Sequence, residues 1–154
     1  MKAKSIRGKS TQEIQVALLE CMSDGFTPTL AIVFISIKQD MDAVVSILHQ
    51  NGIQVFGTTT SGEFISSEIQ EGSIVIMLLD IKPEYFKVAF FEKGENSTHE
   101  IARQLGAEGK SSVAHPAFII ASGWLQTDGE EIIKGIEEGF GSEATIFGGM
   151  AGDD

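Results

Sequence analysis

The sequence contains little cysteine, little proline and few basic residues. One cysteine and three prolines occur among 154 residues. A single thiol cannot form a disulfide within the chain, which is typical of proteins from a reducing compartment. Lysine and arginine number 11 against 22 acidic residues, so the formal net charge is −11. Because nucleic acids and anionic membranes bind clustered positive charge, the composition argues against both partners and favours a soluble, cytoplasmic protein.

Long hydrophobic runs and common catalytic motifs are also absent. The longest apolar runs, 30–35 and 74–79, are far too short to span a bilayer. No apolar segment of a secretion signal follows the basic first ten residues. The chain lacks both glycine-rich phosphate-binding motifs and the Gly-x-Ser-x-Gly of a nucleophile elbow. Its histidines, His49, His99 and His115, are scattered. We therefore predict no cofactor, no metal site and no catalytic centre.

Hydrophobic periodicity predicts an α/β fold. Continuous β-branched runs indicate buried strands, and apolar residues spaced by three and four indicate amphipathic helices. We predict strands at 30–35, 53–57, 74–80, 86–91, 117–121 and 144–147, and helices at 11–23, 40–50, 97–105 and 127–139. The helices flank a mixed, largely parallel sheet, with an antiparallel hairpin near residues 72–92. No internal repeat is apparent.

Helix starts are indicated by a serine or threonine with a glutamate three positions later. Ser10, Ser97 and Thr127 fit this capping-box pattern. Cys21 has the spacing of the apolar residues in the first helix, which favours a buried core thiol over a nucleophile. The small and polar segment 106–116 is predicted to be a loop or a frayed helix end, and the glycine-rich stretch that begins at Gly148 is predicted to be a loop.

Candidate ligand contacts lie in three polar stretches that follow predicted strands. Ligands of open α/β sheets bind beyond the carboxyl ends of the strands, where glycine allows close backbone approach and hydroxyl groups supply hydrogen bonds. The residues predicted to bind a ligand are Thr58, Thr59, Thr60, Ser61, Gly62, Glu63, Trp124, Gly148, Gly149 and Asp153. Glu63 and Asp153 would receive a ligand amine, and Trp124 would form a stacking wall.

Each stretch also has a purely structural interpretation. The hydroxyl groups of residues 58–63 are equally consistent with an ordinary turn. Trp124 is also consistent with a lid over the core, and the acidic residues 153–154 with a solvated chain end. Thr127 and Asp128 are better explained by helix capping than by catalysis.

Three segments resemble the N-terminal FIST domain. They are Phe-Gly-Thr-Thr-Thr-Ser-Gly-Glu at 56–63 followed by the strand at 73–80, Gly-Glu-Glu-Ile-Ile-Lys-Gly-Ile at 129–136, and Phe-Gly-Gly-Met-Ala-Gly-Asp at 147–153. The resemblance covers nearly the whole chain, taken as one domain, 1–154. It implies an intracellular sensory domain of signal transduction that binds small ligands, amino acids among them. Output partners would be histidine kinases or chemotaxis-type transducers.

The resemblance leaves several functions open. The family usually pairs this domain with a C-terminal FIST domain, which this chain lacks, so we expect either a fragment or a short stand-alone form. The leading hypothesis is a sensor in which a ligand shifts the population of loop arrangements. One alternative is a hydrolase that uses Ser61, Asp128 or Asp153 as nucleophile or base. Another is a protein-interaction module without a ligand, and homodimer formation is compatible with all three.

Overall fold

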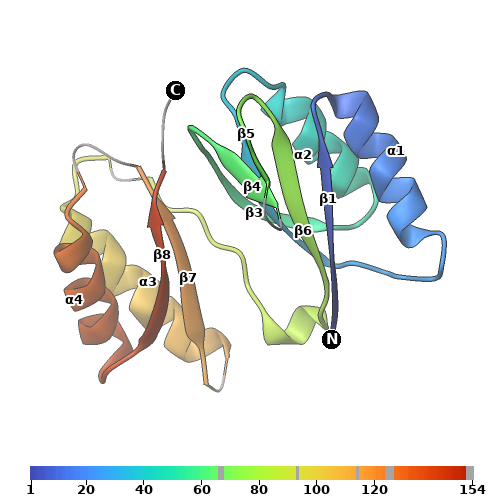
Figure 1. Ribbon diagram of the computed structural model, residues 1–154. Helices are drawn as coiled ribbons and strands as arrows, with labels where there is room; N and C mark the ends of the chain where they lie inside the picture. The colour runs from blue at the N-terminus through green and yellow to red at the C-terminus, as the bar shows by residue number, and fades with distance from the viewer. Residues whose placement is uncertain (66–67, 93, 114, 124–126, 152–154) are drawn as a thin grey trace. The chain divides into compact units, whose positions relative to one another are not determined.

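The computed structural model describes residues 1–65, 68–92, 94–113, 115–123 and 127–151 (Figure 1). Contacts divide the chain into two compact units, which are described separately. Unit 1 comprises Met1–Pro83 together with Ala151, and unit 2 comprises Glu84–Met150. None of the helices in the described ranges is long and apolar enough to cross a membrane.

Unit 1 is built on a four-stranded mixed sheet. Its elements are β1 (Lys2–Gly8), α1 (Thr11–Met22), β2 (Leu30–Ile35), α2 (Met41–Gln50), β3 (Gln54–Thr59), β4 (Glu63–Ile65), β5 (Glu68–Gln70) and β6 (Ile74–Asp80). The 3₁₀ turn η1 (Pro83–Tyr85) follows β6 in the chain and includes the first two residues of unit 2. The strand order is β1-β6-β2-β3, with β4 and β5 forming a separate hairpin. Strands β2 and β3 are parallel, whereas β6 runs antiparallel to both of its neighbours. The predicted α/β class and mixed sheet are confirmed.

The core of unit 1 lies between one face of this sheet and helices α1 and α2. Alternate residues of β6, namely Ile74, Ile76 and Leu78, are completely buried. They pack with Ile14 and Leu18 of α1 in one hydrophobic cluster that also includes residues of α2. The apolar face of the strand, made of every second residue, therefore packs against the apolar face of the helix, made of residues about four apart.

The prediction that residues 86–91 form a strand and pair with β6 in a hairpin is wrong. Residues 86–91 contain no strand, and Phe90 is 84% exposed. The antiparallel neighbour on that side of β6 is β1, with Lys2 opposite Asp80 and Gly8 opposite Ile74. Because β2 occupies the other side of β6, no edge remains for a further strand. Strand β1 escaped prediction because it is polar at most positions and buries only Ile6 and Gly8.

Unit 2 contains two helices and a parallel pair of strands. Its elements are α3 (Thr98–Ser112), β7 (Ala117–Ser122), α4 (Gly129–Phe140) and β8 (Thr145–Met150). Both helices lie on one face of the strand pair (Figure 1). Ala102, Phe118 and Ile136 are the buried centre of this core, and the rings of Phe118 and Phe140 meet edge to face with centroids 6.0 Å apart. The predicted loop at Gly148 is wrong in part, since the strand continues through Met150.

Glycines bring the backbones of α3 and α4 into direct contact. A Cβ atom at Gly106 would collide with the carbonyl group of Ile136, and one at Gly139 would collide with that of Arg103. This close approach explains why α3 continues to Ser112, into the segment 106–116 that was predicted to be a loop or a frayed end. Packing against α4 outweighs the weak helix propensity of Gly106.

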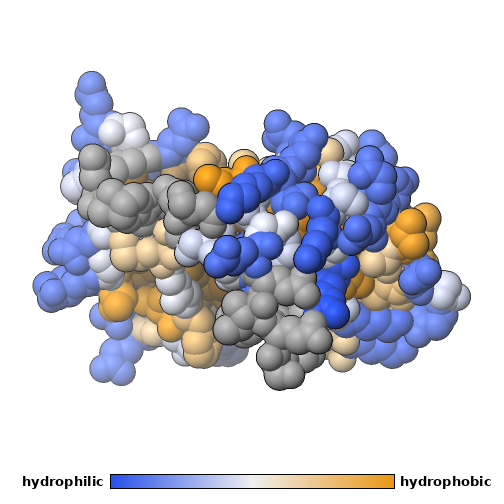
Figure 2. Space-filling model, turned by 45° about the horizontal axis from the view of Figure 1, so that its top comes forward, coloured by the Kyte–Doolittle hydropathy of each residue, from blue (hydrophilic) through white to orange (hydrophobic). Residues whose placement is uncertain are grey.

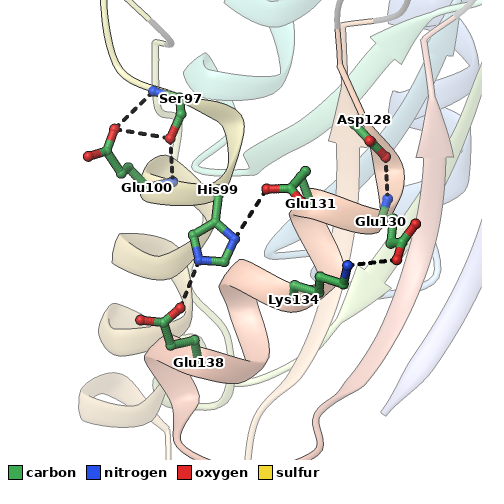
Figure 3. Close-up of polar contacts among 8 residues, drawn as sticks. All are labelled: Ser97, His99, Glu100, Asp128, Glu130, Glu131, Lys134 and Glu138. Atoms are coloured by element: carbon green, nitrogen blue, oxygen red, sulfur yellow. Dashed lines mark hydrogen bonds and ion pairs between the residues drawn. The ribbon is translucent and has the colours of Figure 1, made fainter.

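The helix starts agree with the capping patterns, with one correction. Ser10 Oγ accepts a hydrogen bond from the backbone N–H of Glu13 at 3.2 Å. Ser97 and Glu100 form a complete capping box, with bonds of 3.2 and 3.0 Å (Figure 3). The cap of α4 is Asp128 instead of Thr127, because the Asp128 carboxylate accepts from the N–H of Glu130 at 2.9 Å.

The two parallel strand pairs are built alike, which the sequence alone did not indicate. Each pairs six residues in register, and each second strand has Phe-Gly at its third and fourth positions, at 56–57 and 147–148. Gly57 faces Val33, and Gly148 faces Ile120. At both glycines a Cβ atom would collide with the carbonyl oxygen of the facing residue. Each unit thus contains a β-α-β module of the same design, with a helix crossing between its parallel strands.

We expect Gly139→Ala to destabilise the protein by about 1–3 kcal/mol, because the new methyl group must push α4 away from α3. Gly129→Ala is the matched control, since a Cβ atom there meets nothing within 4 Å and alanine is the better helix former. Urea unfolding of both variants measures the difference. Equal stability of the two variants would contradict the proposed role of the close helix contact.

Candidate functional site

The first predicted site segment lies at the end of the sheet in unit 1. Thr58 and Thr59 are the last residues of β3, and the turn that follows leads into β4 at Glu63. The turn is tied to the neighbouring strand because the N–H of Thr60 donates to the carbonyl oxygen of Ile35 at 3.1 Å. The remaining turn residues, 61–62, are exposed.

Glu63 is the buried centre of this segment. Its side chain is 2% exposed. Oε1 accepts a hydrogen bond from Thr60 Oγ1 at 2.7 Å. Oε2 accepts from both the backbone N–H and the hydroxyl group of Ser73, each at 2.9 Å. The carboxylate therefore fastens the turn after β3 to the start of β6, using donors from unit 1 alone.

Other hydrogen bonds join the loops at the same edge of the sheet. The carboxyl ends of β1, β2 and β3 meet the amino end of β6 there. The N–H of Ser36, which follows β2, donates to the Ser73 carbonyl oxygen at 3.1 Å. The side-chain amide of Gln39 donates to the carbonyl oxygens of Gly72 and Lys9 at 2.7 and 3.1 Å. These bonds hold four loops in one polar network.

Unit 2 contains a groove with a volume of about 360 Å³ between α4 and the strands β7 and β8, which runs from Ala144 at the amino end of β8 to Met150 at its carboxyl end. Its walls are formed by Ile120, Ser122, Gly129, Ile132, Ile133, Glu137, Ala144, Ile146, Phe147, Gly148, Gly149 and Met150. Gly148 has a φ of +150°, which side chains rarely permit. One end of the groove thus reaches the carboxyl ends of the strands, where ligands of α/β proteins usually bind, next to a backbone that a ligand can approach closely.

The predicted site residues are distributed between the two units. The segment Thr58–Glu63 belongs to unit 1, whereas Gly148 and Gly149 belong to unit 2 and line its groove. Trp124 and Asp153 lie outside the described residues. Sequence reasoning missed the contribution of α4, because the apolar spacing of this helix indicated only an amphipathic helix against the sheet. The sequence signal that could have indicated it is the adjacency of Ile132 and Ile133, because neighbouring residues of a helix point in different directions. In the structure Ile133 is 47% exposed.

A polar cluster joins α3 to α4 on their outer surface (Figure 3). His99 Nε2 lies 2.7 Å from Glu138 Oε2, and His99 Nδ1 lies 3.4 Å from Glu131 Oε2. Lys134 forms an ion pair with Glu130 one turn away, at 2.7 Å, and this hydrogen bond raises the pKa of the lysine ammonium group. In the described ranges, no three acidic, histidine or cysteine side chains are grouped to hold a metal ion.

Cys21 is partly buried against the hydrophobic core of unit 1. Burial raises the pKa of its thiol, and the nearby ammonium group of Lys4 offsets only part of this effect. A thiol with a raised pKa is mainly protonated at neutral pH and is a weak nucleophile. The environment therefore favours the predicted packing role of Cys21.

Comparison with known proteins agrees with the resemblance found in the sequence. The family description of the FIST N domain matches residues 29–154. The chain therefore belongs to the FIST N-domain family, whose members are sensory domains of signal transduction. No curated protein and no solved structure gives a significant match.

We expect Glu63→Ala to destabilise the protein by about 2–3 kcal/mol, because it leaves buried donors of Thr60 and Ser73 without their acceptor. Glu71→Ala is the matched control, since Glu71 is an exposed acid two residues before Ser73 and surface substitutions usually change stability by less than about 0.5 kcal/mol. Chemical unfolding monitored by circular dichroism compares the two. A stability loss no larger for Glu63→Ala than for the control would contradict the role of the buried carboxylate.

Proposed function

We propose that the chain is the ligand-binding part of a signal-transduction sensor and that its ligand occupies the groove of unit 2. The observation that carries this proposal is the groove itself, with a volume of about 360 Å³, which lies in the range of small-molecule sites. It combines apolar walls from α4 and β8 with the exposed backbone of Gly148 and Gly149. A metabolite of amino-acid size fits these dimensions.

The turn at Thr58–Gly62 is a separate candidate for ligand contacts within unit 1. It contains four hydroxyl groups, of which those of Thr58 and Thr60 already donate hydrogen bonds within the turn, and free space around Gly62, where a Cβ atom would meet nothing within 4 Å. The buried Glu63 carboxylate holds this turn in place by accepting hydrogen bonds from Thr60 and Ser73. Trp124 and Asp153 keep their predicted roles as hypotheses from the sequence.

Signalling would follow from a population shift of α4. This helix forms one wall of the groove and is held to α3 by close glycine contacts and by His99. A ligand that binds one position of α4 better than another changes the equilibrium between them. A partner that contacts α3 or α4, such as a histidine kinase or a chemotaxis transducer in the cytoplasm, would detect that change.

The hydrolase alternative has weaker support. Asp128 already accepts the N–H of Glu130 at 2.9 Å as the cap of α4. In the part of the chain that the structure describes, Ser61 forms no hydrogen bond with a basic side chain. A nucleophilic serine needs such a base within reach, so the arrangement favours a sensor.

One observation favours the alternative that the chain is a protein-interaction module without a ligand. Ile119 and Phe147 face each other across β7 and β8, and they are 52% and 62% exposed. Apolar pairs of this kind occur in protein interfaces when they are part of a larger patch. The face shown in Figure 2 has mostly hydrophilic side chains, with apolar ones at the surface in separate areas.

We expect Ile133→Gln to weaken binding of a groove ligand roughly tenfold, because it removes apolar contact from the wall formed by α4. Val16→Gln in α1 is the control, since Val16 is also about half exposed but lies in unit 1. A thermal-shift screen of amino acids and small metabolites finds the ligand, and isothermal titration of both variants measures its affinity. If no compound binds, or if both variants bind it equally, the proposed site is wrong.

A further inference from the structure

The groove in unit 2 has an unusual charge composition. Among the twelve lining residues that the structure describes, Glu137 is the only charged one, and Ser122 is the only other residue with a polar side chain. The others are glycine or apolar, and five of them are Ile120, Ile132, Ile133, Ile146 and Phe147. None of these described lining residues is a lysine, arginine or histidine. Over the part of the wall that the structure describes, the chemistry is therefore a single negative charge in apolar surroundings.

Glu137 differs from the other acidic residues of α4. Glu130 is paired with Lys134, and Glu131 and Glu138 both face His99 (Figure 3). Within the described ranges, the carboxylate of Glu137 forms no hydrogen bond or ion pair. The residue is also partly buried. Three of the four glutamates of the helix are thus engaged, and the one on the groove wall keeps its acceptor oxygens available.

An available carboxylate beside apolar walls favours one kind of ligand. The attraction between opposite charges is stronger where the surroundings exclude water than it is in bulk solvent. A ligand ammonium or guanidinium group would donate charge-assisted hydrogen bonds to Glu137. A phosphate or carboxylate at the same position would be repelled, and none of the described lining residues is a cation that could compensate. The apolar remainder of the ligand would contact the isoleucines.

The dimensions of α4 set the size of such a ligand. Gly129 and Glu137 both line the groove, and they are about two turns apart, which corresponds to roughly 12 Å along the helix axis. A molecule with a four- or five-carbon body can therefore place its nitrogen at Glu137 while its body lies beside Ile133.

We propose that Glu137 selects the charge of the ligand and that the groove binds small molecules with a cationic nitrogen and a compact apolar body. This inference rests on the proposed function, because it assigns a ligand class to the same groove. It differs from recognition of a complete amino acid. The cationic head and the apolar body are sufficient, and an amine without a carboxylate binds at least as well as the amino acid that contains it.

Three probes with one apolar body test this charge selection. Isopentylamine, isopentyl alcohol and 4-methylvalerate carry the same isopentyl group. They differ only in the polar group attached to it, which is an ammonium, a hydroxyl or a carboxylate group, respectively. Titration of the wild-type protein, followed by NMR, is expected to give an amine affinity at least about tenfold above that of the alcohol. The carboxylate is expected to bind more weakly than the alcohol.

Two charge-neutralising variants separate the contribution of Glu137 from the general acidity of the protein. Glu137→Gln is expected to lower amine affinity about tenfold and to leave alcohol affinity within twofold. Glu143→Gln is the control, because Glu143 is exposed and lies outside the groove lining. It should change neither affinity by more than about twofold.

The outcomes distinguish this inference from the function on which it rests. If all three probes bind equally, the groove is a ligand site but charge selection by Glu137 is wrong. If Glu137→Gln weakens amine and alcohol alike, the residue has only a structural role, which also overturns the inference. If no probe binds the wild-type protein, both the charge selection and the proposed use of the groove are wrong.

Discussion

The contact between the backbones of α3 and α4 is the constraint on which the groove depends. Gly106 of α3 and Gly135 and Gly139 of α4 allow an approach that any side chain at these positions would prevent. The approach fixes α4 over the parallel strands β7 and β8, so the apolar side chains that it does not bury against them form the groove wall. Glycine at these positions lowers the intrinsic helix stability of α3 and α4, and the closer packing in the core of unit 2 offsets this loss.

A second constraint operates in each β-α-β module. Gly57 and Gly148 follow a phenylalanine in the second strand, and each lies against the carbonyl oxygen of the facing strand. In unit 1 the chain that follows is held by Glu63, whose buried carboxylate receives bonds from two loops. In both modules, a strand that contains such a close backbone contact leads into the segment at the carboxyl ends of the parallel strands.

Sequence patterns predicted the elements whose signals are local. The strand Leu30–Ile35 and the helix starts at Ser10 and Ser97 are examples, because apolar runs and capping bonds involve residues close in sequence. Features that depend on distant partners were missed. Strand β1 exists because β6 offers it an edge, and the long α3 exists because α4 packs against Gly106. Glu137 was missed for the same reason, since only the fold places it on a groove wall.

Isoleucine methyl NMR tests the central claim, ligand binding in the groove of unit 2, most directly. The groove isoleucines Ile120, Ile132, Ile133 and Ile146 serve as reporters, and the buried isoleucines of unit 1, Ile14, Ile53, Ile74 and Ile76, serve as internal controls. During titration with a ligand that stabilises the protein, we expect saturable shifts in the first set and little change in the second. Shifts confined to the second set, or absent from the first, would contradict the account.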